Sequence, residues 1–265
     1  MQTYTPPQTL EDAHALIAHQ QAALVRLHAA HDTWMRAVAH DLRAPLRHVM
    51  SFAPLLKESV QELAAAAPHA NEAADDAQEF AATMAQSARK MSAMLDGMAQ
   101  VSRAARMPLQ AQALDWAALT QPLVQALQAR HPQVRWTMPT QPAPVLADAQ
   151  GLTLVMQALL DNAIKFSAAH AQPHISLHAQ PTAGAWRLAV HNNGAGFDDS
   201  RAQTLGELFQ RMHRDSEFEG VGCGLALVST LAQRHGAQWS VQSQPHAGCT
   251  VYLDWPIAIA DAGLY

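Results

Sequence analysis

The 265-residue chain has room for one large domain or two medium ones, and an apolar content of 49% is enough to form a core. A formal net charge of -5 argues against nucleic-acid binding. No apolar run approaches the roughly 20 residues that a membrane span needs, and the polar start does not resemble a signal peptide. Two cysteines are too few for a disulfide framework, so we expect a cytoplasmic protein.

Apolar residues in the first hundred positions follow helical spacing. The N-terminal stretch repeats every seven residues, as in a coiled coil. Two further apolar seams run through residues 42–63 and 80–101 with alternating steps of three and four. Pro68 marks the turn between them. These patterns predict a coiled-coil helix that leads into an antiparallel helical hairpin.

A single hairpin of this kind cannot bury the apolar seams of both of its helices. Two hairpins that pack as a four-helix bundle can, so we predict a homodimer. The alternative is a monomer whose hairpin packs on the rest of its own chain.

Helix irregularity is concentrated around residues 38–46. Four apolar residues there follow one another in steps of four, which is a stutter that locally unwinds a coiled coil. Pro45 also removes a helix hydrogen bond. His40 lies two residues from Val38, about 200° around the helix, and is therefore expected to face solvent.

After residues 106–108 the composition changes to strand-like segments, glycine pairs and prolines. The expected helices are 115–130, capped by Asp115, 148–167, capped by Asp148, and 224–235. The expected strands are 109–114, 134–138, 145–147, 174–179, 186–192, 239–242 and 250–255. This order predicts an α+β sandwich in which helices cover one face of a mixed sheet.

The first motif with chemical potential is the pair His40 and Asp41. A neutral imidazole can attack a phosphoryl group, and the ordinary pKa of histidine keeps it neutral near pH 7. A neighbouring carboxylate can hold the other ring N–H and stabilise the positive charge that develops. An exposed helix histidine without function is the competing interpretation.

The second motif, Asn162 and Lys165, places an amide and an ammonium on one face of a helix. An amide oxygen can ligate Mg²⁺, and an ammonium can meet phosphate oxygens. An ordinary amphipathic helix would look the same.

Two glycine pairs complete the set. Gly194 and Gly196 follow a strand, where they allow a tight turn beside a planar ligand. Gly222 and Gly224 open a helix, whose first N–H groups can cradle phosphates. The polar residues 197–220 between the pairs are typical of a mobile lid.

In this order and spacing, the motifs resemble those of two-component sensor histidine kinases, especially the kinase modules of bacterial phytochromes. Residues 40–45 resemble the H box of that family, 161–166 its N box, 193–197 its first glycine box, 209–213 the segment before the lid and 222–225 its second glycine box.

The resemblance implies a domain plan and a mechanism. The plan is a signalling helix over 1–39, a dimerisation and histidine phosphotransfer domain over 30–106, and a Bergerat-type (GHKL) ATP-binding domain over 107–258. His40 would take the γ-phosphoryl group of ATP, with Asp41 as the general base or orienting group, and pass it to an aspartate of a response-regulator receiver domain. An upstream sensor domain or sensor protein would supply the stimulus.

The resemblance also assigns the nucleotide site. Asn162 would bind Mg²⁺ and Lys165 the phosphates. The remaining implied ATP contacts are Asn192, Gly194, Gly196, Arg211, Gly222, Gly224 and Leu225.

Two positions in the nucleotide site depart from the family pattern. Ala158 stands where relatives usually carry a second Asn, and Asn192 stands where they carry the Asp that binds adenine. An uncharged acceptor at 192 would cost roughly 1–2 kcal/mol of binding free energy. The alternative function is therefore a nucleotide-impaired pseudokinase that acts as a dimeric interaction or phosphotransfer module. An ATPase of the gyrase or Hsp90 type is disfavoured, because these enzymes use a catalytic Glu where Ala158 lies.

Overall fold

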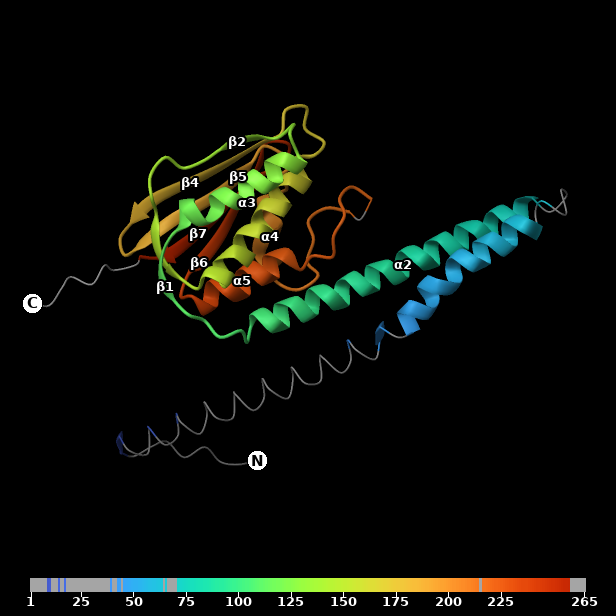
Figure 1. The fold of residues 1–265 in the computed structure, drawn as a ribbon, viewed down its shortest axis with the longest axis horizontal. Coiled ribbons are helices and arrows are strands. Elements are labelled where there is room, and N and C mark those ends of the chain that lie inside the picture. Colours follow the sequence, from blue (N-terminus) through green and yellow to red (C-terminus); the bar gives the residue numbers. More distant parts are fainter. Residues whose placement is uncertain are drawn as a thin grey trace, which may run out of the picture. The chain divides into compact units, whose positions relative to one another are not determined.

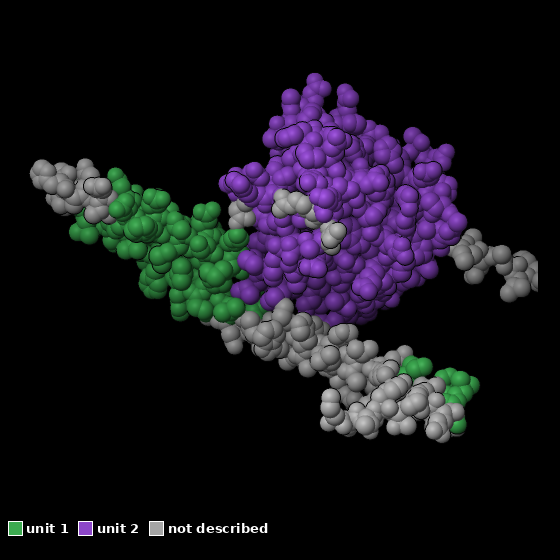
Figure 2. Space-filling view, turned by 180° about the vertical axis from the view of Figure 1, so that it is seen from behind, with its two compact units in different colours: residues 1–92 green, residues 93–265 purple. Residues whose placement is uncertain are grey.

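A computed structural model describes most of the chain from residue 71 onward and part of what precedes it. The described residues are 9–10, 14, 17, 39, 42–43, 45–63, 65, 71–214 and 216–257. His40, Asp41, the predicted turn at Pro68 and nearly all of the predicted coiled coil lie outside this set. The chain divides into two compact units, residues 1–92 and 93–265 (Figure 2).

The first unit contains the predicted helical hairpin (Figure 1). Residues 45–63 are helical and run back along the first part of α2 (Asn71–Ala104). The buried positions of both helices are spaced by seven residues: Leu46 and Ala53 on one, Ala74, Ala81 and Ala88 on the other. The interior of the hairpin is therefore lined mainly by alanine, which allows the two helices to approach closely.

The larger apolar side chains of the predicted α2 seam lie on the outside of this hairpin. Phe80 is 65% exposed, Met84 49% and Met91 46%. Phe52 and Leu55 of the other helix are more than half exposed as well. The part of the predicted seam at Phe80, Met84 and Met91 is thus a surface of the single chain, whereas the alanine positions form the contact within the hairpin.

The second unit is an α+β sandwich, as predicted. Its five-stranded sheet has the order β2-β4-β5-β7-β6, in which β2 pairs with β4 in parallel and the other pairs are antiparallel. The strands are β2 (Arg135–Thr137), β4 (His174–Thr182), β5 (Ala185–Asn192), β6 (Gln238–Gln244) and β7 (Gly248–Pro256). A separate antiparallel pair consists of β1 (Gln112–Asp115) and β3 (Pro144–Ala147).

Three helices lie on one side of the sheet: α3 (Trp116–Arg130), α4 (Ala149–Ser167) and α5 (Gly224–Arg234) (Figure 1). Asp115 and Asp148 cap α3 and α4 by accepting hydrogen bonds from backbone N–H groups, as the sequence predicts. Most strands extend one to three residues beyond the predicted limits. The first begins later, at Gln112, and the second is one residue shorter at each end than predicted. Backbone hydrogen bonding between neighbouring strands continues beyond the apolar residues from which the strands were predicted.

The core lies between these helices and the sheet. Along β5 and β7, alternate side chains such as Leu188 and Leu253 are buried against the helices. Trp255 is fully buried and donates its ring N–H to the Leu146 carbonyl at 3.0 Å, which joins the main sheet to β3. One apolar layer therefore holds the strands and helices together.

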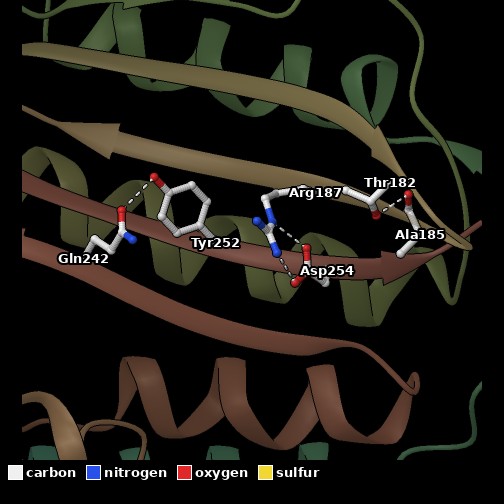
Figure 3. A network of polar contacts seen from close by, with 6 residues as sticks. All are labelled: Thr182, Ala185, Arg187, Gln242, Tyr252 and Asp254. Atoms are coloured by element: carbon white, nitrogen blue, oxygen red, sulfur yellow. Dashed lines mark hydrogen bonds and ion pairs between the residues drawn. The ribbon is translucent and has the colours of Figure 1, made fainter.

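The other face of the sheet carries polar side chains (Figure 3). Arg187 of β5 donates two hydrogen bonds, of 2.7 and 2.8 Å, to the Asp254 carboxylate of β7. The hydrogen bonds from Arg187 hold the pKa of Asp254 below its ordinary value. Tyr252 donates to the Gln242 amide oxygen at 3.2 Å. The sheet thus has helices on one face and a network of polar residues on the other.

None of the helices in the described part of the chain is both long enough and apolar enough to cross a membrane.

Candidate functional site

A cavity of about 620 Å³ lies within the second unit, where the sheet meets α4, α5 and the segment 196–222 that connects β5 to α5. Eight of the residues proposed from the sequence line it: Asn162, Lys165, Asn192, Gly196, Arg211, Gly222, Gly224 and Leu225. Gly194 does not line it and lies behind the cavity wall, against the backbone of Phe166. Residues as far apart in the sequence as Asn162 and Leu225 thus form one site.

The floor of the cavity is formed by strands and is mostly apolar. Val190 of β5 lies opposite Val251 of β7, and Asn192 lies opposite Cys249. Burial raises the pKa of the Cys249 thiol to about 11, so this side chain is neutral at pH 7. Ala163 of α4 adds to the apolar lining. A floor of this kind suits a flat, uncharged ring system.

Asn192 is held in a defined orientation at this floor. The side chain is only 6% exposed. In the amide orientation that satisfies its neighbours, its oxygen accepts from the Gly194 N–H at 3.1 Å and its NH₂ donates to the Cys249 carbonyl at 3.3 Å. Side chains alternate between the two faces of a strand, so Asn192 is expected on the same side as Val190. Both residues line the cavity, whereas Ala189 and His191 do not.

The first glycine turn allows backbone segments to approach more closely than side chains would permit. A Cβ atom at Gly194 would collide with the Phe166 carbonyl oxygen, and one at Gly196 with that of Gln244. Gly196 also has a φ of 56°, which disfavours other residues. Between them, Ala195 donates its N–H to Phe166 at 3.0 Å. This turn therefore joins α4 to the end of the sheet.

Two cationic side chains that line the same cavity are Lys165 of α4 and Arg211 of the segment 197–220. Burial, followed by the charge of Arg211, lowers the pKa of Lys165, whereas Asp161 acts in the opposite direction. The Lys165 ammonium lies 4.3 Å from the centre of the Phe166 ring. Two positive charges that face one cavity repel each other when the cavity holds no ligand. A bound polyanion would turn this repulsion into attraction between the ligand and both side chains.

The second glycine turn presents the N-terminus of α5 to the cavity. Gly222 has a φ of 76°, and its carbonyl accepts a hydrogen bond from the Phe209 N–H at 3.0 Å. This bond joins the two ends of the segment 209–222. Cys223, the N-cap of α5, makes no side-chain capping bond. Together with Gly224 and Leu225 it lines the cavity. The first N–H groups of α5 are thus available to an anion.

The metal-binding potential of the site depends on Asn162. No cluster of three or more His, Cys, Asp or Glu side chains able to hold a metal occurs among the described residues. Asn162 lines the cavity beside Gly224 and offers an amide oxygen of the type that Mg²⁺ accepts. The donor set therefore fits a magnesium ion that takes most of its ligands from bound phosphates and water.

A second cavity, of about 440 Å³, lies on the other side of Asn162, between α3 and α4. Ala158, where the family resemblance leads us to expect Asn, is among its lining residues. The small side chain at 158 thus offers no polar group next to Asn162.

Sequence reasoning missed the contribution of α2 to the first cavity. Five residues near the end of this helix line it: Ala93, Asp96, Gly97, Gln100 and Arg103. A Cβ atom at Gly97 would lie 2.6 Å from the Cys223 sulfur, so the two helices touch at this glycine. No other glycine precedes Gly151 in the sequence, and a lone glycine in a long helix was the signal available.

Substitution of Gly97 tests this contact. Ala normally stabilises an exposed helix by about 1 kcal/mol relative to Gly. We expect Gly97→Ala to lower the thermal midpoint of the chain instead, because the new methyl group meets Cys223. The double variant with Cys223→Gly, which removes the opposing atoms, should recover most of the loss. A higher midpoint for Gly97→Ala alone would show that the helices do not touch there.

Comparison with known proteins agrees with this geometry. Residues 30–106 match the His Kinase A (phospho-acceptor) domain family, and residues 147–259 match the histidine kinase-, DNA gyrase B-, and HSP90-like ATPase family. Cyanobacterial phytochrome A of Nostoc is 27% identical over 93% of this chain and 31% of its own length. Phytochrome-like protein Cph1 of Synechocystis is 29% identical over 83% of this chain and 28% of its own length.

Among solved structures, full-length ShkA in complex with AMPPNP has a similar fold, with a TM-score of 0.57 and 21% identity over 86% of this chain and 46% of that one. The chain spans about a third of the length of the two phytochromes. With both domain families in the expected order, the chain belongs to the two-component sensor histidine kinases.

Proposed function

We propose that this chain is a kinase module that transfers the γ-phosphoryl group of ATP to His40. The observation that carries the proposal is the cavity itself. It combines an apolar floor, the cations Lys165 and Arg211 and the N-terminus of a helix in a domain of the ATPase family, and a phospho-acceptor domain precedes it.

Each part of ATP has a matching part of the cavity. The purine fits the floor at Val190 and Val251, and the triphosphate fits Lys165, Arg211 and the N-terminus of α5. Asn162 would hold Mg²⁺, which neutralises phosphate charge during transfer. The lowered pKa of Lys165, caused by burial and by Arg211, is consistent with an ammonium that a bound polyanion would stabilise.

At the acceptor, the His40 imidazole forms a bond to the γ-phosphorus while ADP leaves. Asp41 takes up or stabilises the ring proton. His40 then passes the phosphoryl group to an aspartate on a response-regulator receiver domain, and an upstream sensor determines when this happens. We place these events in the cytoplasm, where receiver domains and ATP are available.

The exposed apolar surface of the hairpin supports a homodimer. Phe80, Met84 and Met91 of α2, with Phe52 and Leu55 of the other helix, form the apolar set that the single chain leaves in water. Contiguous apolar side chains of this size are typical of interfaces. A second copy of the hairpin would bury them in a four-helix bundle.

Labelling with [γ-³²P]ATP and Mg²⁺ tests the proposal. We expect acid-labile label on the wild-type chain and none on His40→Gln, because the amide cannot accept a phosphoryl group. His48→Gln is a matched control, since His48 is an exposed helical histidine eight residues further along the chain. Label that persists in His40→Gln would contradict the assignment. Absence of both label and nucleotide binding in the wild type would support the pseudokinase alternative suggested by Ala158 and Asn192.

A further inference from the structure

Asn192 is the buried polar side chain at the floor of the cavity. Among the cavity-lining residues that the structure describes, no other uncharged amide or hydroxyl group is less than 9% exposed. Its neighbours on the floor are Val190, Val251 and the neutral thiol of Cys249. A ligand that enters this apolar region can therefore satisfy an inward-facing polar edge chiefly through Asn192.

The edge of a purine that reaches Asn192 follows from the shape of the ligand. Ribose is attached at N9, and the triphosphate must extend toward Lys165 and Arg211. The edge farthest from ribose is the one formed by N1 and the substituent at C6. This edge enters the cavity first and meets the floor.

The amide of Asn192 retains both a donor and an acceptor for that edge. An amide has two N–H donors and two acceptor lone pairs. The Cys249 carbonyl uses one donor and the Gly194 N–H uses one lone pair. One N–H and one lone pair are left. A carboxylate at this position would have acceptors only.

Purines differ at this edge in the direction of their hydrogen bonds. Adenine has a donating amino group at C6 and an accepting N1, whereas a 6-oxopurine has an accepting oxygen at C6 and a donating N1. The free lone pair of Asn192 suits the amino group, and its free N–H suits the oxo group. A carboxylate would repel the oxo group.

From this geometry we propose that Asn192 opens the nucleotide site to 6-oxopurine nucleoside triphosphates, which bind about as well as ATP. The proposal deepens the proposed function and rests on it. The acceptor chemistry at His40 is unchanged, because the transferred phosphoryl group is the same.

Competitive displacement of a fluorescent ATP analogue from the full chain, with Mg²⁺, tests the proposal with ATP and inosine triphosphate. Inosine triphosphate differs from ATP at the N1–C6 edge alone. We expect the two dissociation constants to agree within tenfold. A preference of tenfold or more for ATP would overturn the proposal and leave the proposed function intact. Failure of both nucleotides to bind would overturn both.

Asn192→Asp tests whether this residue is responsible. We expect the ratio of the two dissociation constants to shift by about tenfold or more toward ATP, since each hydrogen-bonding pair at a base edge is worth about 1–3 kcal/mol of discrimination. Asn193→Asp is the matched control. Asn193 also donates to a backbone carbonyl, that of Gln172 at 2.9 Å, but it does not line the cavity.

The control should leave the ratio unchanged. An unchanged ratio in Asn192→Asp would overturn the role of Asn192. Thermal unfolding identifies a variant that does not fold, and in that case the wild-type ratio still decides the proposal.

Discussion

Replacement of Lys165 by methionine is expected to weaken ATP binding by about 10- to 100-fold and to leave the ligand-free chain at least as stable as the wild type. Hydrogen bonds from a charged donor contribute about 1.5–3 kcal/mol, which gives the loss of affinity. The ligand-free chain loses an ammonium whose charge is opposed by burial and by Arg211. Methionine keeps the apolar length of the side chain.

Isothermal titration with ATP and thermal unfolding would measure the two effects separately. Lys90→Met, at an exposed lysine of α2 that does not line the cavity, is the control. Undiminished ATP affinity in Lys165→Met would show that Lys165 does not meet the phosphates. A parallel loss of stability would show that the side chain has a structural role instead.

The lowered pKa of Lys165 also sets the sign of a pH effect. Between this pKa and the ordinary value of 10.5, the unfolded chain holds more protons at this lysine than the folded one. The contribution of Lys165 to the free energy of unfolding therefore rises with pH in that window. Over the same range ATP affinity should fall, because the ammonium is lost. Lys165→Met should show neither trend.

Gly196→Ala is expected to destabilise the second unit by more than about 3 kcal/mol and to abolish measurable ATP binding. The new methyl group would collide with the Gln244 carbonyl oxygen and lie 2.8 Å from that of Gly248. Backbone atoms on both sides must move, and an effect of this size is typical when a substitution clashes with fixed neighbours. The turn that would be displaced lines the cavity.

Gly184→Ala separates this clash from the cost of the backbone conformation. Gly184 also has a positive φ, of 81°, but nothing lies within 4 Å of a Cβ atom there. We expect a loss of only about 1–2 kcal/mol and unchanged ATP affinity. Urea unfolding and ATP titration of both variants provide the comparison. Equal losses would mean that the backbone angle, and not the close approach, requires glycine at position 196.

Local patterns in the sequence predicted most of the architecture. Asp115 and Asp148 begin the helices that they were expected to cap, because capping depends on residues only two or three positions away. Period-2 alternation, which also depends on near neighbours, puts Val190 and Asn192 on one side of a strand, and both line the cavity. The spacing of the glycine pairs pointed to turns, and the positive φ angles of Gly196 and Gly222 agree.

Long-range contacts could not be derived in this way. The spacing of apolar residues shows that a helix has a buried stripe, but stripes of large and of small residues fit the same spacing. Only the packed hairpin shows that Ala81 and Ala88 face inward while Phe80 faces out. The residue type at 192 was visible in the sequence, but the atoms that bind its amide belong to Gly194 and to Cys249, which lies on another strand.

The sequence alone determined the family, the order of elements and the candidate residues, since these follow from short-range chemistry. Only the tertiary structure decided which backbone groups those residues meet and that the end of α2 joins the cavity, because such contacts depend on packing between segments far apart in the chain.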